Sequence, residues 1–269
     1  MRIPSLLGAL LGVGLVLSAS AQDEVPFVTT PDPVTLVMLQ LAAVGPRDHV
    51  IDLGSGDGRI VITAAKRFGA SGLGVEIVPD LVTRSQERAR TAAVQERVEF
   101  RQQDLFETDL RRASVITMYL LPEVNLQLRP RLLALAPGTR VVSHDWDMGD
   151  WTPDKSVKVD APEKTIGLAK TSQVHLWTVP AQVHGLWCAA GAQLDITQRF
   201  QQFSAALSGR DVPAPGLVFD GRIDATNLRA SGPHVLTLQV DGETLKLLDT
   251  RAVPAAAGRT FRRASGARC

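Results

Sequence analysis

The chain has 269 residues, of which 45% are hydrophobic and 21% charged, and its formal net charge is +1. This composition is typical of a globular protein and excludes both a largely disordered chain and a multi-span membrane protein. The near-neutral charge provides no field that would attract nucleic acid, so no nucleic-acid partner is expected. The length suits one ordinary domain with a smaller one attached.

The first 21 residues have the pattern of an export signal. Arg2 precedes an apolar run from Leu6 to Leu17, and small residues at 19 and 21 suit cleavage before Gln22. The run is shorter than the roughly 20 residues that a membrane-spanning helix needs, so we prefer a cleaved signal peptide over a membrane anchor. Because the positive charge precedes the apolar run, both alternatives place the folded part outside the cytoplasm. In a bacterial host the mature chain would be periplasmic or secreted, with no stable membrane span.

Short β-rich runs alternate with helical stretches over the next 150 residues or so, which predicts an α/β fold with a mostly parallel sheet. We assign residues 22–180 to this domain. Strands are expected at 49–53, 72–77, 98–101, 114–119, 139–144, 156–159 and 174–179. Helices are expected at 59–68, 80–94 and 124–135, after a first helix that Asp32 caps and Pro33 begins.

Residues 181–253 have a different pattern, which predicts a small antiparallel β domain. Apolar and polar residues alternate in 194–200 and in 236–240, the period of a strand with one buried face. Trp187 and Phe200 are expected in the core of this domain.

Residues 254–269 contain several arginines among alanine, glycine and serine, and we expect a disordered basic tail. The only cysteines, Cys188 and Cys269, allow one disulfide at most, and we do not expect it to form. The five histidines show no metal-ligand spacing, so no metal site is predicted.

The most informative stretch is the glycine-rich run after the strand at 49–53. Its spacing is Gly-x-Gly-x-Gly, and such a turn into a helix lets the backbone and free N–H groups approach a ligand. Arg59 stands where a dinucleotide-binding fingerprint has its third glycine, and no Walker lysine follows. A pyrophosphate or nucleoside-triphosphate site is therefore disfavoured.

Three carboxylates lie at the carboxyl ends of three successive predicted strands. Asp52 precedes the glycine run, Glu76 ends the second strand and Asp104 follows the third. The carboxyl ends of parallel strands form the crevice in which open α/β sheets bind ligands, so these groups are expected to meet one ligand. The alternatives are a helix N-cap for Asp52, a turn for Asp104 and a surface pair for Asp57 with Arg59.

The order of these elements resembles the class I, seven-stranded methyltransferases that use S-adenosylmethionine. More narrowly, the run from Asp52 to Glu76, preceded by Pro26-Phe27-Val28, is similar to the protein-lysine methyltransferases that modify the adenine nucleotide translocase and the c-ring protein of ATP synthase, and to their bacterial relatives. The resemblance covers roughly residues 26–180. It implies a doubly wound, Rossmann-like sheet of seven mostly parallel strands.

The resemblance also implies a role for each residue of the cofactor site. Asp52 and the loop would hold the methionine end of S-adenosylmethionine, Glu76 its ribose and Asp104 its adenine. The implied cofactor-binding residues are Asp52, Gly54, Ser55, Gly56, Gly58, Glu76, Asp104 and Leu105. Related enzymes fold an N-terminal segment over the cofactor, so Phe27, Thr29 and Thr30 are either such a lid or a plain proline-rich N-terminus.

The methyl acceptor is expected at the ends of the fourth and fifth strands. The segment 118–123 lacks the Asn- or Asp-Pro-Pro-aromatic run of many amino-directed methyltransferases, which argues against nucleic-acid adenine methylation. A lysine must lose a proton before it accepts a methyl group, and ionisable groups near the strand ends serve this purpose. The candidate catalytic residues are Tyr119, Glu123, His144 and Asp145, with Trp146 and Trp151 as further substrate contacts. Packing beneath a helix is the alternative for Tyr119, and a satisfied histidine under a loop is the alternative for His144.

Three functions are consistent with these patterns. The first is a protein-lysine N-methyltransferase, the second a small-molecule methyltransferase, and the third an exported interaction protein that keeps the fold without turnover. Export is in tension with the first two, because S-adenosylmethionine is made in the cytoplasm.

Overall fold

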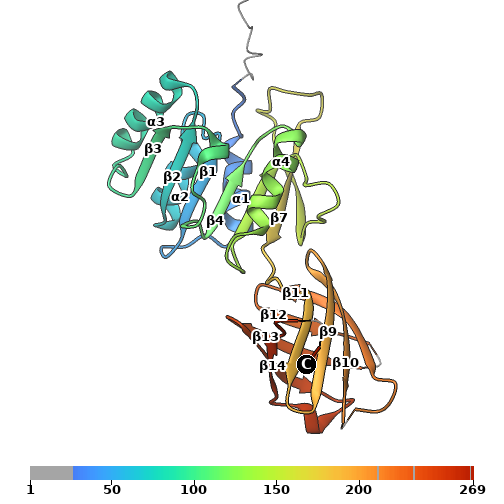
Figure 1. Ribbon diagram of the computed structural model, residues 1–269. Coiled ribbons are helices and arrows are strands. Elements are labelled where there is room, and N and C mark those ends of the chain that lie inside the picture. Colours follow the sequence, from blue (N-terminus) through green and yellow to red (C-terminus); the bar gives the residue numbers. More distant parts are fainter. Residues whose placement is uncertain (1–26, 211, 233, 267) are drawn as a thin grey trace, which may run out of the picture.

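The computed structural model describes residues 27–269 except 211, 233 and 267, and it consists of two units that follow one another along the chain (Figure 1). The predicted signal peptide, residues 1–21, lies outside the described residues. Within the described ranges, no helix has both the length and the apolar character needed to cross a bilayer.

The first unit is built on a seven-stranded sheet with the order β3-β2-β1-β4-β5-β7-β6. The strands β1 to β5 pair in parallel, whereas β7 runs antiparallel to both β5 and β6. The bounds are β1 His49–Leu53, β2 Ser71–Glu76, β3 Val98–Gln102, β4 Val115–Met118, β5 Arg140–His144, β6 Lys155–Asp160 and β7 Thr171–Thr178. The predicted Rossmann-like sheet of seven mostly parallel strands is confirmed.

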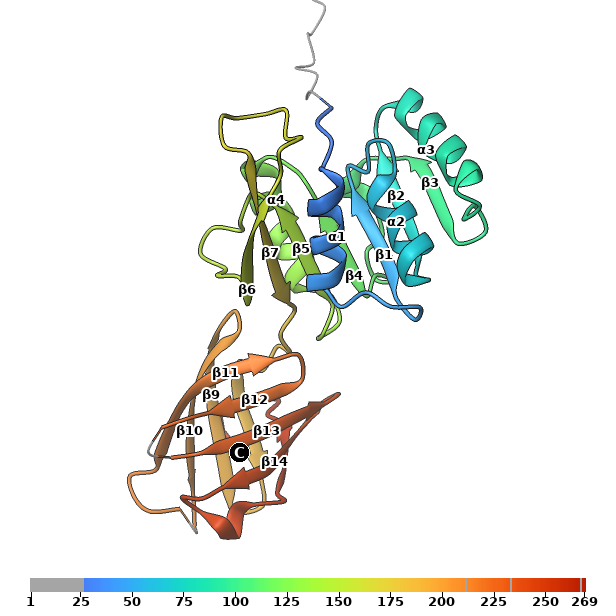
Figure 2. The same cartoon turned by 180° about the vertical axis from the view of Figure 1, so that it is seen from behind.

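Helices cover both faces of this sheet (Figures 1 and 2). One face carries α1 (Asp32–Leu41), α2 (Arg59–Phe68) and α3 (Pro79–Thr91), and the other carries α4 (Pro122–Leu133) with the short 3₁₀ helix η1 (Leu105–Glu107). Alternate strand residues point to opposite faces, so neighbouring Val50 and Ile51 belong to different apolar clusters. Two layers of core therefore hold the sheet, as in other doubly wound folds.

The first helix differs slightly from its prediction. It begins at Asp32, and Pro31 is its N-cap, so the Asp32 side chain does not cap the helix. The carboxylate of Asp32 instead lies 3.6 Å from Nη1 of Arg59.

The second unit is a closed antiparallel barrel of eight strands with the order β10-β11-β12-β13-β14-β15-β8-β9. The bounds are β8 Gly185–Ala189, β9 Ala192–Arg199, β10 Gln202–Gly209, β11 Leu217–Asp224, β12 Asn227–Ala230, β13 Leu236–Asp241, β14 Thr244–Thr250 and β15 Thr260–Arg263, with the 3₁₀ helix η2 (Pro254–Ala256) before β15. Its interior is apolar and contains Trp187, as predicted. Closure pairs every strand on both sides and leaves no free sheet edge.

The prediction of a disordered basic tail is wrong. Thr260–Arg263 forms β15, which pairs with β14 on one side and β8 on the other and so closes the barrel. Phe261 is fully buried in the barrel core, whereas Arg262 and Arg263 lie on the surface. A disulfide joins Cys188 of β8 to Cys269, contrary to our expectation, because β15 brings the end of the chain beside β8. The barrel thus extends beyond the predicted boundary at 253.

The prediction of Phe200 in the barrel core is also wrong. Phe200 lies in the turn between β9 and β10 with a positive φ of 53°. Its ring stacks on Trp151 of the first unit at a centroid distance of 6.2 Å and lies under the guanidinium of Arg129. The turn therefore points away from the barrel and into the neighbouring domain.

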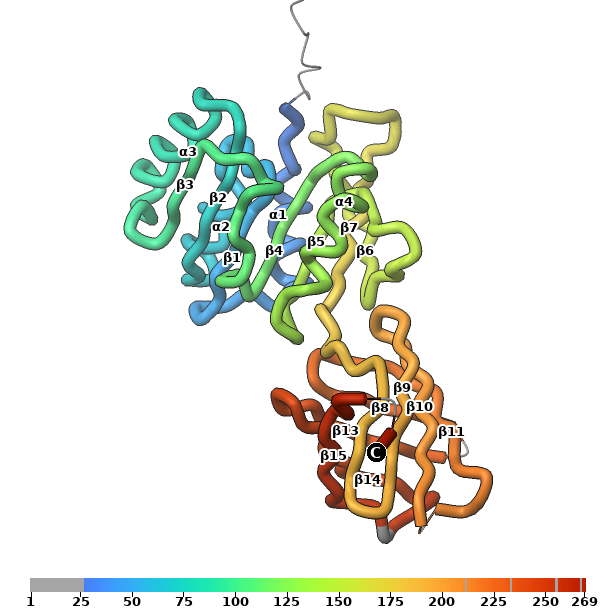
Figure 3. The backbone as a smooth tube through the Cα atoms, in the orientation of Figure 1, coloured from blue at the N-terminus to red at the C-terminus, as the bar shows by residue number. Residues whose placement is uncertain are grey.

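Polar contacts complete this junction. Gln201 donates to the carbonyl oxygen of Thr152 at 2.6 Å, and Arg222 of β11 forms an ion pair with Asp154. Asp154 precedes β6, whose first residue pairs with the end of β7. The barrel is therefore attached at the amino-terminal edge of the parallel strands, and the described chain begins at the opposite edge (Figure 3). The carboxyl-terminal edge, where the predicted site lies, is free of the barrel.

Candidate functional site

The glycine-rich loop connects β1 to α2 at the carboxyl-terminal edge of the sheet. Gly54, Gly56 and Gly58 have φ angles of 73°, 53° and 76°, which other residues rarely adopt. A Cβ on Gly58 would lie 2.7 Å from the ring of Phe100, and a Cβ on Gly54 would lie 3.0 Å from Leu120. The local packing and the backbone conformation both require glycine, so the loop is a built feature of the sheet edge.

Asp52 is enclosed below this loop. Its side chain accepts a hydrogen bond from Thr117 of β4, with 2.7 Å between Oγ1 and Oδ1. Burial raises the pKa of Asp52 to about 7, the nearby charges of Glu76 and Asp57 add to this, and the Thr117 hydrogen bond opposes it. Asp52 does not cap α2, whose N-cap is Gly58, so the N-cap alternative is wrong. A buried carboxylate with a second acceptor oxygen suits a cationic group such as an α-ammonium.

Glu76 links the glycine loop to the end of β2. Its Oε2 accepts from the backbone N–H of Gly56 at 2.9 Å, and Oε1 accepts from Ile77 and Val78 at 2.8 and 3.1 Å. Each carboxylate oxygen has a further lone pair, so the group can still accept hydrogen bonds from a ribose.

Asp104 forms the turn that was its alternative interpretation. Its Oδ1 accepts from the backbone N–H of Phe106 at 2.7 Å and thereby caps η1. Because Oδ2 has no hydrogen bond within the described residues, it can accept from an adenine amino group. Leu105 is half-buried beside it, and 39% of Phe106 is exposed.

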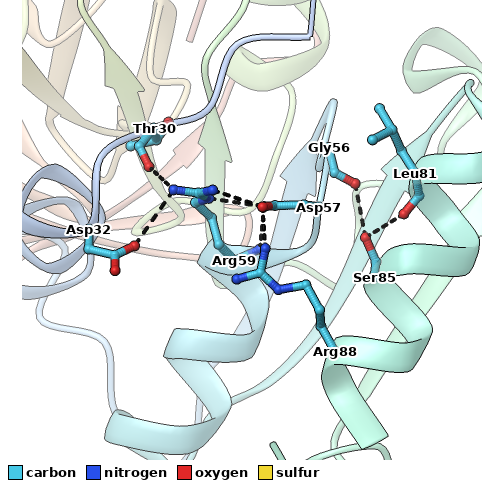
Figure 4. Close-up of polar contacts among 8 residues, drawn as sticks. All are labelled: Thr30, Asp32, Gly56, Asp57, Arg59, Leu81, Ser85 and Arg88. Carbon is cyan, nitrogen blue, oxygen red and sulfur yellow. Dashed lines mark hydrogen bonds and ion pairs between the residues drawn. The ribbon is translucent and has the colours of Figure 1, made fainter. Parts of the chain in front are cut away.

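Asp57 and Arg59 form the pair that was their alternative interpretation, but the carboxylate is buried and the pair is part of a larger network (Figure 4). Asp57 is 5% exposed and accepts from Arg59, with 2.8 Å between Nη2 and Oδ2, and from Arg88 of α3. Burial opposes the ionisation of Asp57, but the hydrogen bonds and charges of the two arginines hold its pKa below the ordinary value. Arg59 also donates to the carbonyl oxygen of Thr30 at 2.9 Å. The network thus joins the glycine loop to α3 and to the N-terminal segment.

The segment 27–30 passes over the site. A Cβ on Gly56 would collide with the ring of Phe27, so this ring packs directly against the glycine loop. Three residues later, Thr30 is buried and its hydroxyl lies 3.1 Å from Nδ1 of His144 at the end of β5. This path supports the lid interpretation, because one short segment contacts both the predicted cofactor loop and the predicted acceptor side.

Tyr119 and Asp145 meet on the acceptor side, where β4 and β5 end. The Tyr119 hydroxyl donates to Oδ2 of Asp145 at 3.5 Å. Burial and the charge of Asp145 raise the pKa of Tyr119 to about 12, so the phenol is protonated at neutral pH and acts as a donor. Its ring lies on that of His144, with 3.8 Å between the centroids.

His144 is fully buried and has a partner at each ring nitrogen. Nδ1 faces Thr30, and Nε2 lies 2.8 Å from the hydroxyl of Ser172. Burial holds the pKa of His144 below its ordinary value, so the ring is neutral at pH 7. These contacts favour the satisfied-histidine alternative, in which His144 positions the Tyr119 ring and does not exchange protons with a substrate.

Asp145 is the centre of the acceptor side. Its backbone has a positive φ of 63°, and its Oδ1 accepts from the N–H of Gln173 at 2.9 Å. Its Oδ2 lies 2.7 Å from Nζ of Lys164, a residue that the sequence did not suggest. Burial opposes the ionisation of Asp145, but Lys164 and the Gln173 N–H hold its pKa below the ordinary value. The group is therefore a carboxylate that already binds a lysine ammonium.

The other expected acceptor residues do not join this cluster. Glu123 is exposed at the start of α4 and has no hydrogen bond or ion pair with the residues named above, within the part of the chain that is described. Trp151 is fully buried against Phe200 at the junction with the barrel, so its expected substrate contact is wrong. Trp146 is 44% exposed beside Asp145 and stays a predicted substrate contact. A missed residue is Asn125, whose buried amide donates to the carbonyl oxygen of Trp146 at 3.3 Å and so supports this loop.

Comparison with known proteins identifies the relatives of this chain. A model of the ANTKMT methyltransferase domain matches residues 52–155. A protein-lysine N-methyltransferase of Saccharolobus islandicus is 43% identical over 139 residues, which are 51% of this chain and 86% of that protein. The adenine nucleotide translocase lysine N-methyltransferase of Mus musculus is 35% identical over 110 residues, which are 40% of this chain but only 48% of its own length.

A solved structure is similar as well. The RNA methyltransferase of Salinibacter ruber, crystallised with S-adenosyl-L-homocysteine, is 51% identical and has a TM-score of 0.53. The match covers 58% of this chain and 96% of that one. The relative bound to S-adenosyl-L-homocysteine and the carboxylates at the ends of β1, β2 and β3 agree that the site takes S-adenosylmethionine.

Proposed function

The chain belongs to the protein-lysine N-methyltransferase family of S-adenosylmethionine-dependent enzymes, and we propose that it methylates a lysine amine held between Tyr119 and Asp145. The observation that carries this assignment is the contact of 2.7 Å between Oδ2 of Asp145 and the ammonium of Lys164, a lysine of the chain itself. The same oxygen accepts from the Tyr119 hydroxyl, at the end of the strand next to β1. A lysine on this carboxylate therefore lies beside the cofactor site.

S-adenosylmethionine supplies a methyl group that its sulfonium has already activated. The protein has to bind the amine, remove a proton from it and align it. Asp145 is the group suited to binding the amine, because it is ionised and contacts the ammonium directly. Tyr119 orients Asp145 through its hydroxyl, and its ring provides an aromatic wall for the substrate methylenes. His144 keeps that ring in place by stacking.

The exposed surroundings favour a macromolecular acceptor over a small molecule. Leu121 and Trp146, which follow the ends of β4 and β5, are 48% and 44% exposed. Apolar side chains open to solvent at the mouth of a site suit contact with a larger partner. A small substrate is expected to be enclosed by a pocket instead.

RNA is the second candidate acceptor. The similar Salinibacter ruber protein is an RNA methyltransferase, and cationic residues line a groove along α2, namely Arg59, Lys66, Arg67 and Arg88. Against this candidate, Arg59 and Arg88 are already paired with Asp57, and the carboxylate of Asp145 attracts an ammonium but repels phosphate. We therefore favour lysine.

The test begins with the cofactor and then compares acceptors. Titration calorimetry of the chain from Gln22 should give micromolar binding of S-adenosylmethionine, about −8 kcal/mol, with strong weakening in Glu76→Ala and Asp104→Ala. Transfer of labelled methyl groups is then measured to polylysine and to total RNA. We expect label in polylysine and none in RNA, and Asp145→Asn should abolish transfer while retaining cofactor binding.

A matched control is Asp147→Asn, because Asp147 is exposed and two residues along the same loop. It should transfer methyl groups at the wild-type rate. Label in RNA alone, or equal transfer by Asp145→Asn and wild type, would contradict the lysine assignment.

We further propose that the mature chain functions outside the cytoplasm of a bacterial cell. The apolar N-terminal run supports export, and the disulfide between Cys188 and Cys269 supports an oxidising compartment, because such bonds are rare in the cytosol. Cell fractionation with non-reducing mass analysis tests this. The expected result is a cleaved, oxidised chain in the periplasm or medium, whereas a reduced, uncleaved cytoplasmic chain contradicts the proposal.

A further inference from the structure

Lys164 extends from the connection between β6 and β7, which reaches the carboxyl-terminal edge of the sheet. The connection is closed by a hydrogen bond from the N–H of Ala161 to the carbonyl oxygen of Lys170 at 2.8 Å. A second bond, from the N–H of Lys164 to the carbonyl oxygen of Ala161, forms a turn. Nζ of Lys170 holds the carbonyl oxygen of Lys164 at 2.8 Å. The backbone of residue 164 is thus fixed on both sides.

The side chain of Lys164 points into the site. It is 14% exposed, and Nζ contacts Oδ2 of Asp145 at 2.7 Å and the carbonyl oxygen of Thr171 at 3.1 Å. An ammonium has three N–H donors, so two partners leave one N–H direction without an acceptor among the described residues. When the ammonium loses a proton, that direction is available for its lone pair.

Lys164 itself occupies the position that we assign to the substrate amine. Asp145 Oδ2 is shared by Nζ of Lys164 and the hydroxyl of Tyr119, so the amine lies where β4 and β5 end. An ordinary surface ion pair would join Lys164 to one of the exposed carboxylates of the chain. Lys164 instead contacts the carboxylate that faces the acceptor side.

We propose that Lys164 is an intramolecular substrate: its amine occupies the acceptor position, and the enzyme methylates it. The inference rests on the proposed function, because it uses the same cofactor and the same carboxylate. It goes further by identifying a modification site within the chain. It also implies that an external lysine must displace Lys164 before it reaches Asp145.

The ammonium of Lys164 first loses one proton to water. The nitrogen lone pair then forms a bond to the methyl carbon as the carbon–sulfur bond breaks, and that bonding electron pair stays on sulfur. The products are methylated Lys164, S-adenosylhomocysteine and one proton. No oxidant or further reactant is needed.

The first test is mass mapping of the full chain after incubation with methyl-deuterated S-adenosylmethionine. We expect one, two or three labelled methyl groups on Lys164 and none on Lys170, which shares the same connection and serves as an internal control. The rate constant should not change when the protein is diluted, because the reaction occurs within one molecule. Polylysine in a parallel reaction reports whether the enzyme is active.

The second test needs no turnover. Binding of n-butylamine to the cofactor-free protein is measured for wild type, Lys164→Gln and Lys158→Gln, the last a matched loss of an exposed charge on β6. Removal of a tethered competitor should tighten amine binding on the order of tenfold in Lys164→Gln and leave Lys158→Gln like wild type.

The outcomes separate this inference from the proposed function. Unmodified Lys164 in a preparation that methylates polylysine overturns the inference alone, and so does equal amine affinity in wild type and Lys164→Gln. If neither Lys164 nor polylysine is methylated by a protein that binds the cofactor, the proposed function is wrong as well.

Discussion

Asp52 at the end of β1 and Thr117 of β4 share a hydrogen bond of 2.7 Å within the sheet, and the carboxylate is 2% exposed. The Thr117 hydroxyl is the only hydrogen-bond donor to this carboxylate among the described residues. Burial therefore dominates and raises the pKa of Asp52 to about 7, so the group titrates in the physiological range. Its charge is well stabilised only when a cation joins it, and this links the protonation of Asp52 to cofactor binding.

Cofactor affinity should therefore depend on pH. Ionised Asp52 attracts the α-ammonium of S-adenosylmethionine, whereas protonated Asp52 does not. Below about pH 7 the affinity should fall by up to tenfold per pH unit, and above it the affinity should level off. Calorimetry across this range measures the slope. A flat profile for wild type would show that Asp52 does not contact the ammonium.

The variant Asp52→Asn should separate stability from binding. Because the folded-state pKa of Asp52 is raised from 3.8 to about 7, the free energy of unfolding falls by about 4 kcal/mol as the pH rises through this window. Asparagine keeps the Thr117 contact and carries no charge. Relative to wild type, the ligand-free variant should gain stability between about pH 4 and pH 7, yet bind the cofactor weakly and without pH dependence. Urea unfolding at several pH values tests the gain, and an unchanged difference between the two proteins would contradict it.

Much of the sheet and its helices could be predicted because the relevant signals are local. The helix at 59–68 is bounded by Gly58 and Gly69, both left-handed, and its predicted ends are correct. The strand at 49–53 was also predicted correctly. The strand β15 could not be predicted in this way. Its pairing partner β8 lies about seventy-five residues earlier, and its arginines mask the single buried residue Phe261.

The site was predictable to a similar extent. Asp52, Glu76 and Asp104 lie at the ends of strands whose ends must meet, and Tyr119 and Asp145 lie at the ends of the next two in the same way. Lys164 had no such signal, because its connection reaches the site only through the antiparallel pairing of β6 with β7. Glu123 was expected from its nearness in sequence, but the start of α4 directs it to solvent.

Thr30→Val should loosen the N-terminal segment. The substitution removes the hydroxyl next to Nδ1 of His144 and leaves a buried polar atom without a partner, at a cost of about 1–3 kcal/mol. The change should also raise the mobility of Phe27 over Gly56 and weaken cofactor binding. Thermal unfolding and calorimetry check both effects. Thr29→Val is the matched control, since Thr29 has no side-chain hydrogen bond within the described residues. Equal unfolding temperatures and equal cofactor affinities of the two variants would refute the role of Thr30.

Phe200→Ala should uncouple the barrel from the methyltransferase domain. The ring of Phe200 is stacked on Trp151 and covered by Arg129, so its loss removes the apolar centre of the junction, about 2 kcal/mol for a half-buried ring. We expect two separate calorimetric transitions where wild type shows overlapping ones. Cofactor binding should not change, because the junction lies at the amino-terminal edge of the sheet. The exposed Val218→Ala is the control, and a loss of cofactor binding in Phe200→Ala would argue against independent domains.

Reduction of the disulfide should destabilise the barrel alone. The bond between Cys188 and Cys269 closes a loop with a sequence separation of 81 residues, and the lower entropy of the cross-linked unfolded chain stabilises the fold by about 4 kcal/mol. The paired variant Cys188→Ser with Cys269→Ser should therefore lower the unfolding temperature of the barrel and leave that of the methyltransferase domain in place. It should bind S-adenosylmethionine like wild type, because neither cysteine is near Asp52 or Glu76 in the fold. Equal stability of the oxidised and reduced wild-type barrel would mean that β15 and the buried Phe261 close the barrel without the covalent bond.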